Sequence, residues 1–441
     1  MDGRDHRRTL VGLARPVYFS LLASVAAGII NTVWVARLGG DAVAAVAVAT
    51  NVENVLLGVA LVFGSGTTVL VAHARGAEDP AAVRAAVRGG WGLCALVVPV
   101  VAVGGWLARE GVARLVLGGG DAGALRLAVA YFGVSMPGLS VFFVQQLVDG
   151  ILKGAGDTRT PMRLALLANG LILVLDPLLI HAYGVVGAAV ATVTARSVAL
   201  GVSLWVVRRN PVLGRGVEPS CGTVAAVRRT LRTGLPMAVD FTVRQTGALA
   251  LVAVVARLGV TAVAAYAVAY KVLYVATMAF YAVRQAAAIH TAQRRGAGHD
   301  ERRAIGRQSM LVAGSVGLVA ALLFLALAPW LMRAFGAPPE VAAEGVLFLR
   351  GVGPYLILLA GFIALGGVFE GSGGAPRAAR VTLLGTVLQL PCAYWLSGLW
   401  GLAGVCAAMG AAMAVQCGCL VAMARRAAVQ EEAGTEWSRA A

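Results

Sequence analysis

The chain has 441 residues, of which 59% are hydrophobic and only 13% are charged, and its mean hydropathy is +0.81. A soluble protein of this length needs a wetted surface, so the composition excludes a soluble globular protein and indicates an integral membrane protein. The net charge of +16 does not indicate nucleic-acid binding, because the basic residues gather in alternate loops between apolar runs.

These basic residues are nearly all arginines, and they follow the positive-inside pattern of a multi-pass membrane protein. The loops between the clusters carry few basic residues. We therefore expect a bacterial inner-membrane protein with both termini in the cytoplasm. Its expected partner is the lipid bilayer and not a nucleic acid. The clusters lie at 4–8, 75–88, 159–163, 208–229, 294–307, 377–380 and 425–426.

Apolar runs long enough to cross a hydrocarbon layer of about 30 Å recur from end to end, and inside a bilayer such runs must be helical. A basic linker at 208–231 divides them into an N-lobe at 1–207 and a C-lobe at 232–426, followed by a cytoplasmic tail at 427–441. The predicted fold is therefore all-α, with twelve transmembrane helices at 16–36, 43–72, 89–108, 126–148, 161–183, 186–207, 233–256, 262–291, 309–334, 342–369, 379–398 and 401–424.

The two halves of the chain form an internal repeat. Residues 36–49 align without gaps to residues 256–269 at an offset of 220, and Pro16 and Pro236 share that offset. Residues 150–156 match residues 367–373 at an offset of 217, as does Gly184 with Gly401. Six is an even number, so both repeats enter the membrane from the same side. We therefore predict two parallel six-helix repeats around a central cleft, the architecture of a secondary transporter.

The stretch INTVWVARLGGDAVAAVAVA in the first repeat, together with GILKGAGDTRTPM and NGLILVLDPLLIHAYGVVGAAVAT between residues 150 and 192, resembles a known family. These segments are similar to the multidrug and toxic compound extrusion (MATE) transporters, in particular to their DNA-damage-inducible-F branch. The resemblance covers nearly the whole chain. It implies a two-lobed, twelve-helix transporter that expels organic cations in exchange for sodium ions or protons.

The resemblance also implies roles for individual residues. Pro16 matches the proline at which the first helix of the family bends, so it is the predicted helix hinge. Asp176 matches an acid of the N-lobe cation site, and Thr194 matches a hydroxyl on the sixth helix. Asp149 falls where relatives often have asparagine. Two positions depart from the family, because Asn31 stands where an aspartate is usual and Ile172 where an asparagine is common.

Few acids lie deep in the predicted spans, where a charge is costly and needs a partner or a function. Asp176 and Asn31 each lie about 15 residues into their helices, so they could face one cavity at one depth. Because Asn31 is neutral, no second carboxylate raises the proton affinity of Asp176. The sequence therefore favours a sodium ion at Asp176, with Asn31 and Thr194 as oxygen donors.

Other polar residues deep in the predicted spans have both functional and structural interpretations. Glu53 and Lys271 lie at similar depths and are candidates for a charge pair across the cleft, or for two independent charges. Asn169 is a further candidate for the cation site, although such an amide more often bonds a neighbouring helix. A structural ion network, rather than a gate, is predicted for Asp240, Arg244 and Arg284.

No motif for an enzyme or for ATP binding is visible, so the energy must come from an ion gradient. We therefore expect a monomeric antiporter for small organic cations that uses Na⁺ or H⁺ as its coupling ion, works by alternating access and needs no cofactor or transition metal. One alternative is a flippase for lipids or lipid-linked oligosaccharides. A more distant alternative is a membrane enzyme that acts on a lipid substrate.

Overall fold

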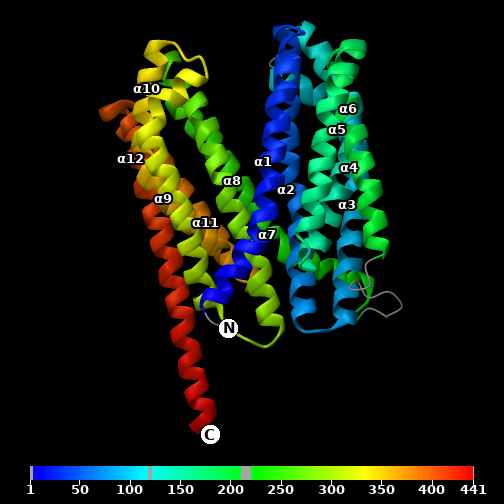
Figure 1. Cartoon of the computed structure of the whole chain (residues 1–441), viewed down its shortest axis with the longest axis vertical. Helices are drawn as coiled ribbons and strands as arrows, with labels where there is room; N and C mark the ends of the chain where they lie inside the picture. Colours follow the sequence, from blue (N-terminus) through cyan, green and yellow to red (C-terminus); the bar gives the residue numbers. More distant parts are fainter. Residues whose placement is uncertain (1–2, 118–121, 210–219, 441) are drawn as a thin grey trace. The chain divides into compact units, whose positions relative to one another are not determined.

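The computed structural model describes residues 3–117, 122–209 and 220–440, with side chains up to Arg425. Every regular element within these ranges is an α-helix (Figure 1). The helices are α1 (Gly3–Ala36), α2 (Gly40–Gly76), α3 (Pro80–Leu117), α4 (Ala122–Gly154), α5 (Arg159–Tyr183), α6 (Val185–Arg209), α7 (Thr223–Ala256), α8 (Val260–Gly296), α9 (Arg302–Ala334), α10 (Pro339–Gly351), α11 (Gly353–Gly371) and α12 (Ala375–Ala440).

The described helices account for all twelve predicted membrane spans, although not one helix to one span. Eleven of them are long and apolar enough to cross a membrane. The shorter α10 joins α11 at Val352 to make the tenth predicted span. The long α12 contains two spans, because the backbone leaves the helical region at Trp400 and Gly401. The chain is therefore an all-α, multi-pass membrane protein, as the sequence predicts.

Several helices extend beyond their predicted spans. Helix α1 begins at Gly3 rather than near residue 16, and α7 begins at Thr223 inside the predicted linker. Arginine and alanine are good helix formers, and neither extension contains a proline that would stop a helix before the apolar run begins. Residues 210–219 of the predicted linker lie outside the described residues. The predicted tail is a continuation of α12 as far as Ala440.

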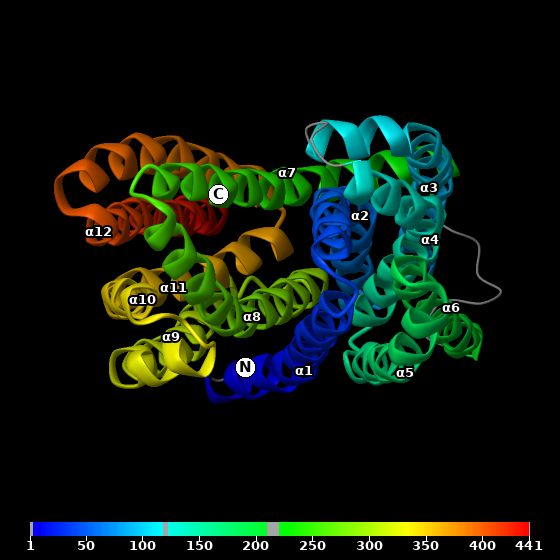
Figure 2. The same ribbon diagram turned by 90° about the horizontal axis from the view of Figure 1, so that it is seen from above.

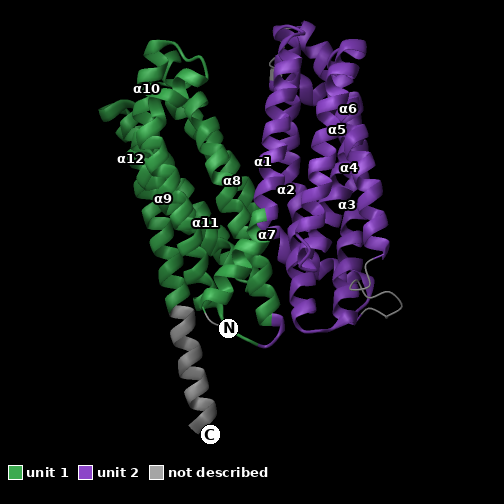
Figure 3. Ribbon diagram, viewed as in Figure 1, with its two compact units in different colours: residues 1–15, 239–295, 299–441 green, residues 16–238, 296–298 purple. Residues whose placement is uncertain are grey.

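The chain separates into two compact units (Figure 3). The N-terminal unit comprises residues 16–238 and 296–298, and the C-terminal unit comprises the described parts of 3–15, 239–295 and 299–440. Two helices are thus divided between the units, since α1 changes unit at Pro16 and α7 changes unit at Val239. These boundaries differ from the predicted ones, which kept residues 1–36 together in the N-lobe and began the C-lobe at residue 232.

Helix α4 is the centre of the N-terminal unit, where it packs against α2, α3 and α6, while α5 packs against α6 (Figure 2). The contact of α4 with α2 is close because glycines face each other. A Cβ on Gly150 would meet the carbonyl oxygen of Gly64 at 2.5 Å. Thr68 also donates a hydrogen bond of 3.1 Å to the carbonyl oxygen of Gly150. Small residues allow such approach between membrane helices.

The internal repeat is visible in the backbone of each unit. Gly39 and its equivalent Gly259 have φ values of 105° and 110°. Gly184 and its equivalent Gly401 have φ values of 57° and 58°, with ψ values of −137° and −135°. Only glycine adopts these conformations without strain. The structure therefore confirms the repeat at both offsets found in the sequence.

Candidate functional site

Two polar contacts join α1 to α5 in the N-terminal unit. The Nδ2 atom of Asn31 donates a hydrogen bond of 2.8 Å to Oδ2 of Asp176. The Nδ2 atom of Asn169 lies 3.3 Å from Oγ of Ser24. Both contacts have the same sequence separation, and the second lies seven residues, or two helical turns, before the first on each helix. Helices α1 and α5 thus run parallel, and two polar side-chain contacts join them at equivalent levels.

Among the described residues of the N-terminal unit, Asp176 is the acid that is fully buried. Its Oδ1 atom has no hydrogen-bond partner among the described residues. Ile172, one turn earlier on α5, is also buried, so the wall on that side is apolar. A buried polar atom without a partner costs free energy in a protein interior. The unpaired, buried Oδ1 atom makes Asp176 a candidate functional residue.

Two further charged residues share Tyr131 as a neighbour with this carboxyl group. Tyr131 on α4 lies within electrostatic range of Glu53 on α2 and of Arg196 on α6, and also of Asp176. Arg196 stands over the ring of Phe142 at 4.7 Å. The polar set of the N-terminal unit thus includes Tyr131 and Arg196, neither of which the sequence reading placed near Asp176. The sequence does contain a feature that could have identified Arg196. It is a basic residue in the middle of an apolar span, outside every arginine cluster, where a charge needs a partner or a function.

The second repeat provides an internal comparison for this polar set. The offsets of 220 and 217 convert each of its members into an equivalent position in the C-terminal unit. All five equivalents are apolar and buried. The fold therefore does not need polar side chains at these positions, and a purely structural role does not account for the set. Asn31, Glu53, Tyr131, Asp176 and Arg196 correspond to Leu251, Leu273, Phe348, Ala393 and Met413.

Two other predicted members of the cation site, Thr194 and Asp149, form no hydrogen bond to Asp176 in the described structure. The side chain of Thr194 is exposed on α6. Asp149, on α4, accepts a hydrogen bond of 2.8 Å from Nε2 of Gln145. It also lies within electrostatic range of Lys153, one turn later. Asp149 is thus already paired on its own helix.

The predicted ion network exists and is larger than expected. In the C-terminal unit, Arg244 and Arg284 both donate to Oδ2 of Asp240, the latter at 2.5 Å. Nη2 of Arg284 also donates to Oε1 of Glu370 at 2.6 Å, and the hydroxyl of Thr382 donates to Oδ1 of Asp240. The sequence reading missed Glu370 and Thr382, because they come from α11 and α12, which only tertiary packing brings to α7 and α8.

Lys271 and Glu53 belong to different units. Lys271 is exposed on α8, whereas Glu53 is half-buried on α2. The predicted charge pair between them, and the bending of α1 at Pro16, stay predictions. Helix α1 is continuous through Pro16 here, although the ring removes one backbone donor from its interior.

Known proteins are similar to this chain in sequence and in fold. The MatE family model matches residues 16–178 and 236–395. The "Probable multidrug resistance protein NorM" of Thermotoga maritima is 26% identical over 403 residues, which are 88% of this chain and 85% of that protein. A solved MATE transporter of Vibrio cholerae superposes with a TM-score of 0.90 at 19% identity, with 96% and 97% of the two chains covered.

A second solved structure has the same fold. It is a transporter of the MOP superfamily from Pyrococcus furiosus, described as having a binding pocket of reversed polarity, and it has a TM-score of 0.84 at 20% identity over 95% of this chain and 94% of that one. At such identities the solved structures establish the fold alone. The family match over most of the chain goes further, and this protein belongs to the MatE family of multidrug efflux transporters, which are not enzymes.

Proposed function

We propose that the protein is an ion-coupled antiporter that exports small organic cations from the bacterial cytoplasm by alternating access between its two units. The observation that carries this proposal is the polar set around Asp176, which stands in one repeat and is replaced by apolar side chains in the other. Family membership supplies the general activity. The polar set supplies a place where an ion and a substrate could compete.

Asp176 is the proposed coupling residue, and the proton is the proposed coupling ion. A sodium ion would need several oxygen ligands, as hard cations do in proteins. Asn31 is the side chain that bonds Asp176 in the described structure, whereas Thr194 forms no hydrogen bond to it and Ile172 is apolar, so few oxygen ligands are in contact with Asp176. A proton needs one oxygen only, and the neutral acid leaves Oδ1 less costly to bury than the carboxylate. This inverts the preference for sodium that the sequence alone suggested.

Glu53 and Tyr131 are the proposed substrate contacts. A carboxylate beside an aromatic ring favours an organic cation over an anion. Arg196 lies within electrostatic range of Glu53 and would stabilise the negative charge of Glu53 when no substrate is bound. Protonation of Asp176 would lower the negative charge of the set by one, and thus weaken cation binding. Proton entry and cation release would be coupled in this way.

A second candidate function is a flippase for lipids with anionic head groups, including lipid-linked oligosaccharides. It is favoured by Arg244 in the C-terminal unit. Its Nε and Nη1 atoms have no hydrogen-bond partner in the described structure, and its guanidinium lies 5.8 Å from the ring of Tyr281. Spare guanidinium donors suit a phosphate or carboxylate. The cation antiporter stays the first proposal because the spare donors are buried.

Everted membrane vesicles test the proposal directly. We expect a fluorescent organic cation to accumulate in vesicles that contain the wild type and to stay at the background level with Asp176→Asn. Asp149→Asn is the matched control, because it alters an acid of the same unit that already has partners. Equal transport by Asp176→Asn and the wild type, at equal protein level, contradicts the assignment of Asp176.

The coupling ion is tested by imposing sodium and proton gradients separately. We expect wild-type transport to follow the proton gradient and to ignore sodium. In Asn31→Asp, two acids share the site and like charges raise the proton affinity of one of them, so the pH at half-maximal transport should rise. Transport that follows sodium in the absence of a pH gradient would refute proton coupling. Accumulation of an anionic lipid but not of cations would favour the flippase.

A further inference from the structure

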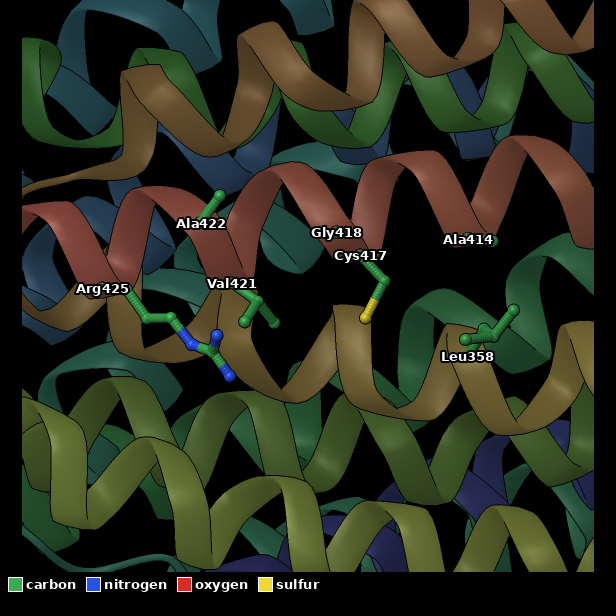
Figure 4. Close-up of a pocket in the computed structure, with 7 residues that line it drawn as sticks. All are labelled: Leu358, Ala414, Cys417, Gly418, Val421, Ala422 and Arg425. Atoms are coloured by element: carbon green, nitrogen blue, oxygen red, sulfur yellow. The ribbon is translucent and has the colours of Figure 1, made fainter.

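A groove of about 530 Å³ runs along the second half of α12 in the C-terminal unit (Figure 4). Its walls come from Leu358 on α11 and from positions on α12 that follow an i, i+3, i+4, i+7 pattern, so they share one helix face. The α12 positions include Ala414, Cys417, Gly418, Val421 and Arg425. The lining is apolar along its whole length except at Arg425, which is the last residue of the chain with a described side chain.

The dimensions and the charge of the groove suit one kind of molecule. Residues 414–425 span about 16 Å of helix, which is about half of the hydrocarbon layer and thus the depth of one leaflet. Gly418 has open space where a Cβ would stand, and the small side chains at 414 and 422 leave room for an acyl chain. Arg425 belongs to the last basic cluster, which the positive-inside pattern places at the membrane surface.

We propose that this groove binds an anionic phospholipid, with an acyl chain along Leu358, Cys417 and Val421 and its phosphate at Arg425. Basic positions at the ends of membrane helices bind acidic head groups, and an apolar groove below such a position excludes soluble anions. A neutral lipid would fill the apolar part equally well but would gain nothing from the guanidinium. The site lies on helices that carry none of the polar residues around Asp176, so it is independent of the transport proposal.

Two native cysteines make the groove measurable in the full-length protein. Cys417 lines the groove, whereas Cys419, two residues later, is exposed. The purified chain in a neutral detergent is mixed with phosphatidylglycerol or phosphatidylcholine of identical acyl chains. Alkylation by a maleimide is then followed at each cysteine by peptide mass spectrometry. We expect phosphatidylglycerol to slow alkylation of Cys417 but not of Cys419, and phosphatidylcholine to have a much smaller effect.

Matched variants separate the charge from the groove. Arg425→Gln should raise the phosphatidylglycerol concentration for half-protection about fivefold, the factor that one arginine near an acidic membrane surface contributes. Arg380→Gln, an exposed arginine elsewhere on α12, should leave it unchanged. Gly418→Leu should abolish lipid-dependent protection by filling the groove. Gly410→Leu is its control, since this glycine also has open space around it but does not line the groove.

Three results would overturn the proposal. Equal protection by the two lipids would mean an unselective apolar surface. An equal effect of Arg425→Gln and Arg380→Gln would remove the head-group contact. Protection that rises with protein concentration in the absence of added lipid would identify a second copy of the chain as the occupant. Native mass spectrometry, which counts the lipids that stay bound to each variant, checks that a loss of protection is a loss of lipid and not a loss of folding.

Discussion

Arg284 is the residue that holds both acids of the ion network in the C-terminal unit. It contacts Asp240 and Glu370, and its side chain is only 8% exposed. Removing one partner from a buried ion network leaves an uncompensated charge and typically costs about 3–5 kcal/mol. We expect Arg284→Met to lower the free energy of unfolding by that amount in detergent titrations. Arg244→Met should cost less, because Arg284 still contacts both acids.

The double variant Arg284→Met, Glu370→Gln distinguishes charge from packing. If the lost charge is the cause, the second change should recover part of the stability, since Asp240 keeps Arg244 as a partner. No recovery in the double variant would mean that Arg284 acts by filling space.

Glu301, in the loop before α9, illustrates a charge outside the membrane spans. Two hydrogen bonds of 2.6 and 2.8 Å from Arg294 lower its pKa to about 2. A lowered folded pKa stabilises the protein above the unfolded value of 4.5, and the contribution is lost as the pH falls towards 2. The stability difference between the wild type and Glu301→Gln should be constant above pH 4.5 and shrink below it. A difference that grows on acidification would contradict the pair.

At the scale of helices, glycines decide how α2 and α7 cross in the N-terminal unit. A Cβ on Gly234 would overlap the carbonyl oxygen of Val62. Backbone atoms cannot rotate away as a side chain does, so the helices would have to separate. We expect Gly234→Ala to lower the free energy of unfolding by at least the roughly 1–3 kcal/mol typical of overpacking.

Gly201→Ala is the control for this substitution. Gly201 lies on α6, and a Cβ atom added there would stand in open space. Alanine there should stabilise the helix by about 0.5–1 kcal/mol, because glycine loses more conformational freedom on folding. Opposite signs for the two variants, measured by the same thermal unfolding, identify the close crossing as the cause. Equal effects would leave the crossing without energetic importance.

At the scale of the whole molecule, the even number of spans and the arginine pattern place both ends on one side of the membrane. Alkaline phosphatase fused after Leu38, between α1 and α2, should be active, because that loop is expected outside. A fusion after Ala77, between α2 and α3, should be inactive, and green fluorescent protein at the C-terminus should fluoresce. A fluorescent C-terminal fusion together with an inactive fusion at Leu38 would contradict the proposed orientation.

The sequence alone determined the all-α membrane fold, the twelve spans and the repeat, because each of these rests on local patterns. Apolar runs must be helical in a bilayer wherever they pack, and glycines such as Gly184 and Gly401 mark the same backbone turn in both repeats. The family followed from the same segments. The sequence predicted that Asn31 and Asp176 lie at one depth and face one cavity, whereas the direct hydrogen bond between them is seen only in the tertiary structure.

Tertiary structure decided which polar groups meet. Thr194 and Asp176 looked like partners by resemblance, but side-chain direction on packed helices leaves Thr194 exposed. Arg196, Glu370 and Thr382 joined their clusters only through contacts between helices far apart in the chain. The division of α1 and α7 between the two units was likewise hidden, since it depends on which neighbours each half of a continuous helix packs against. Local sequence specifies helices, whereas the partners of a buried charge are specified by packing.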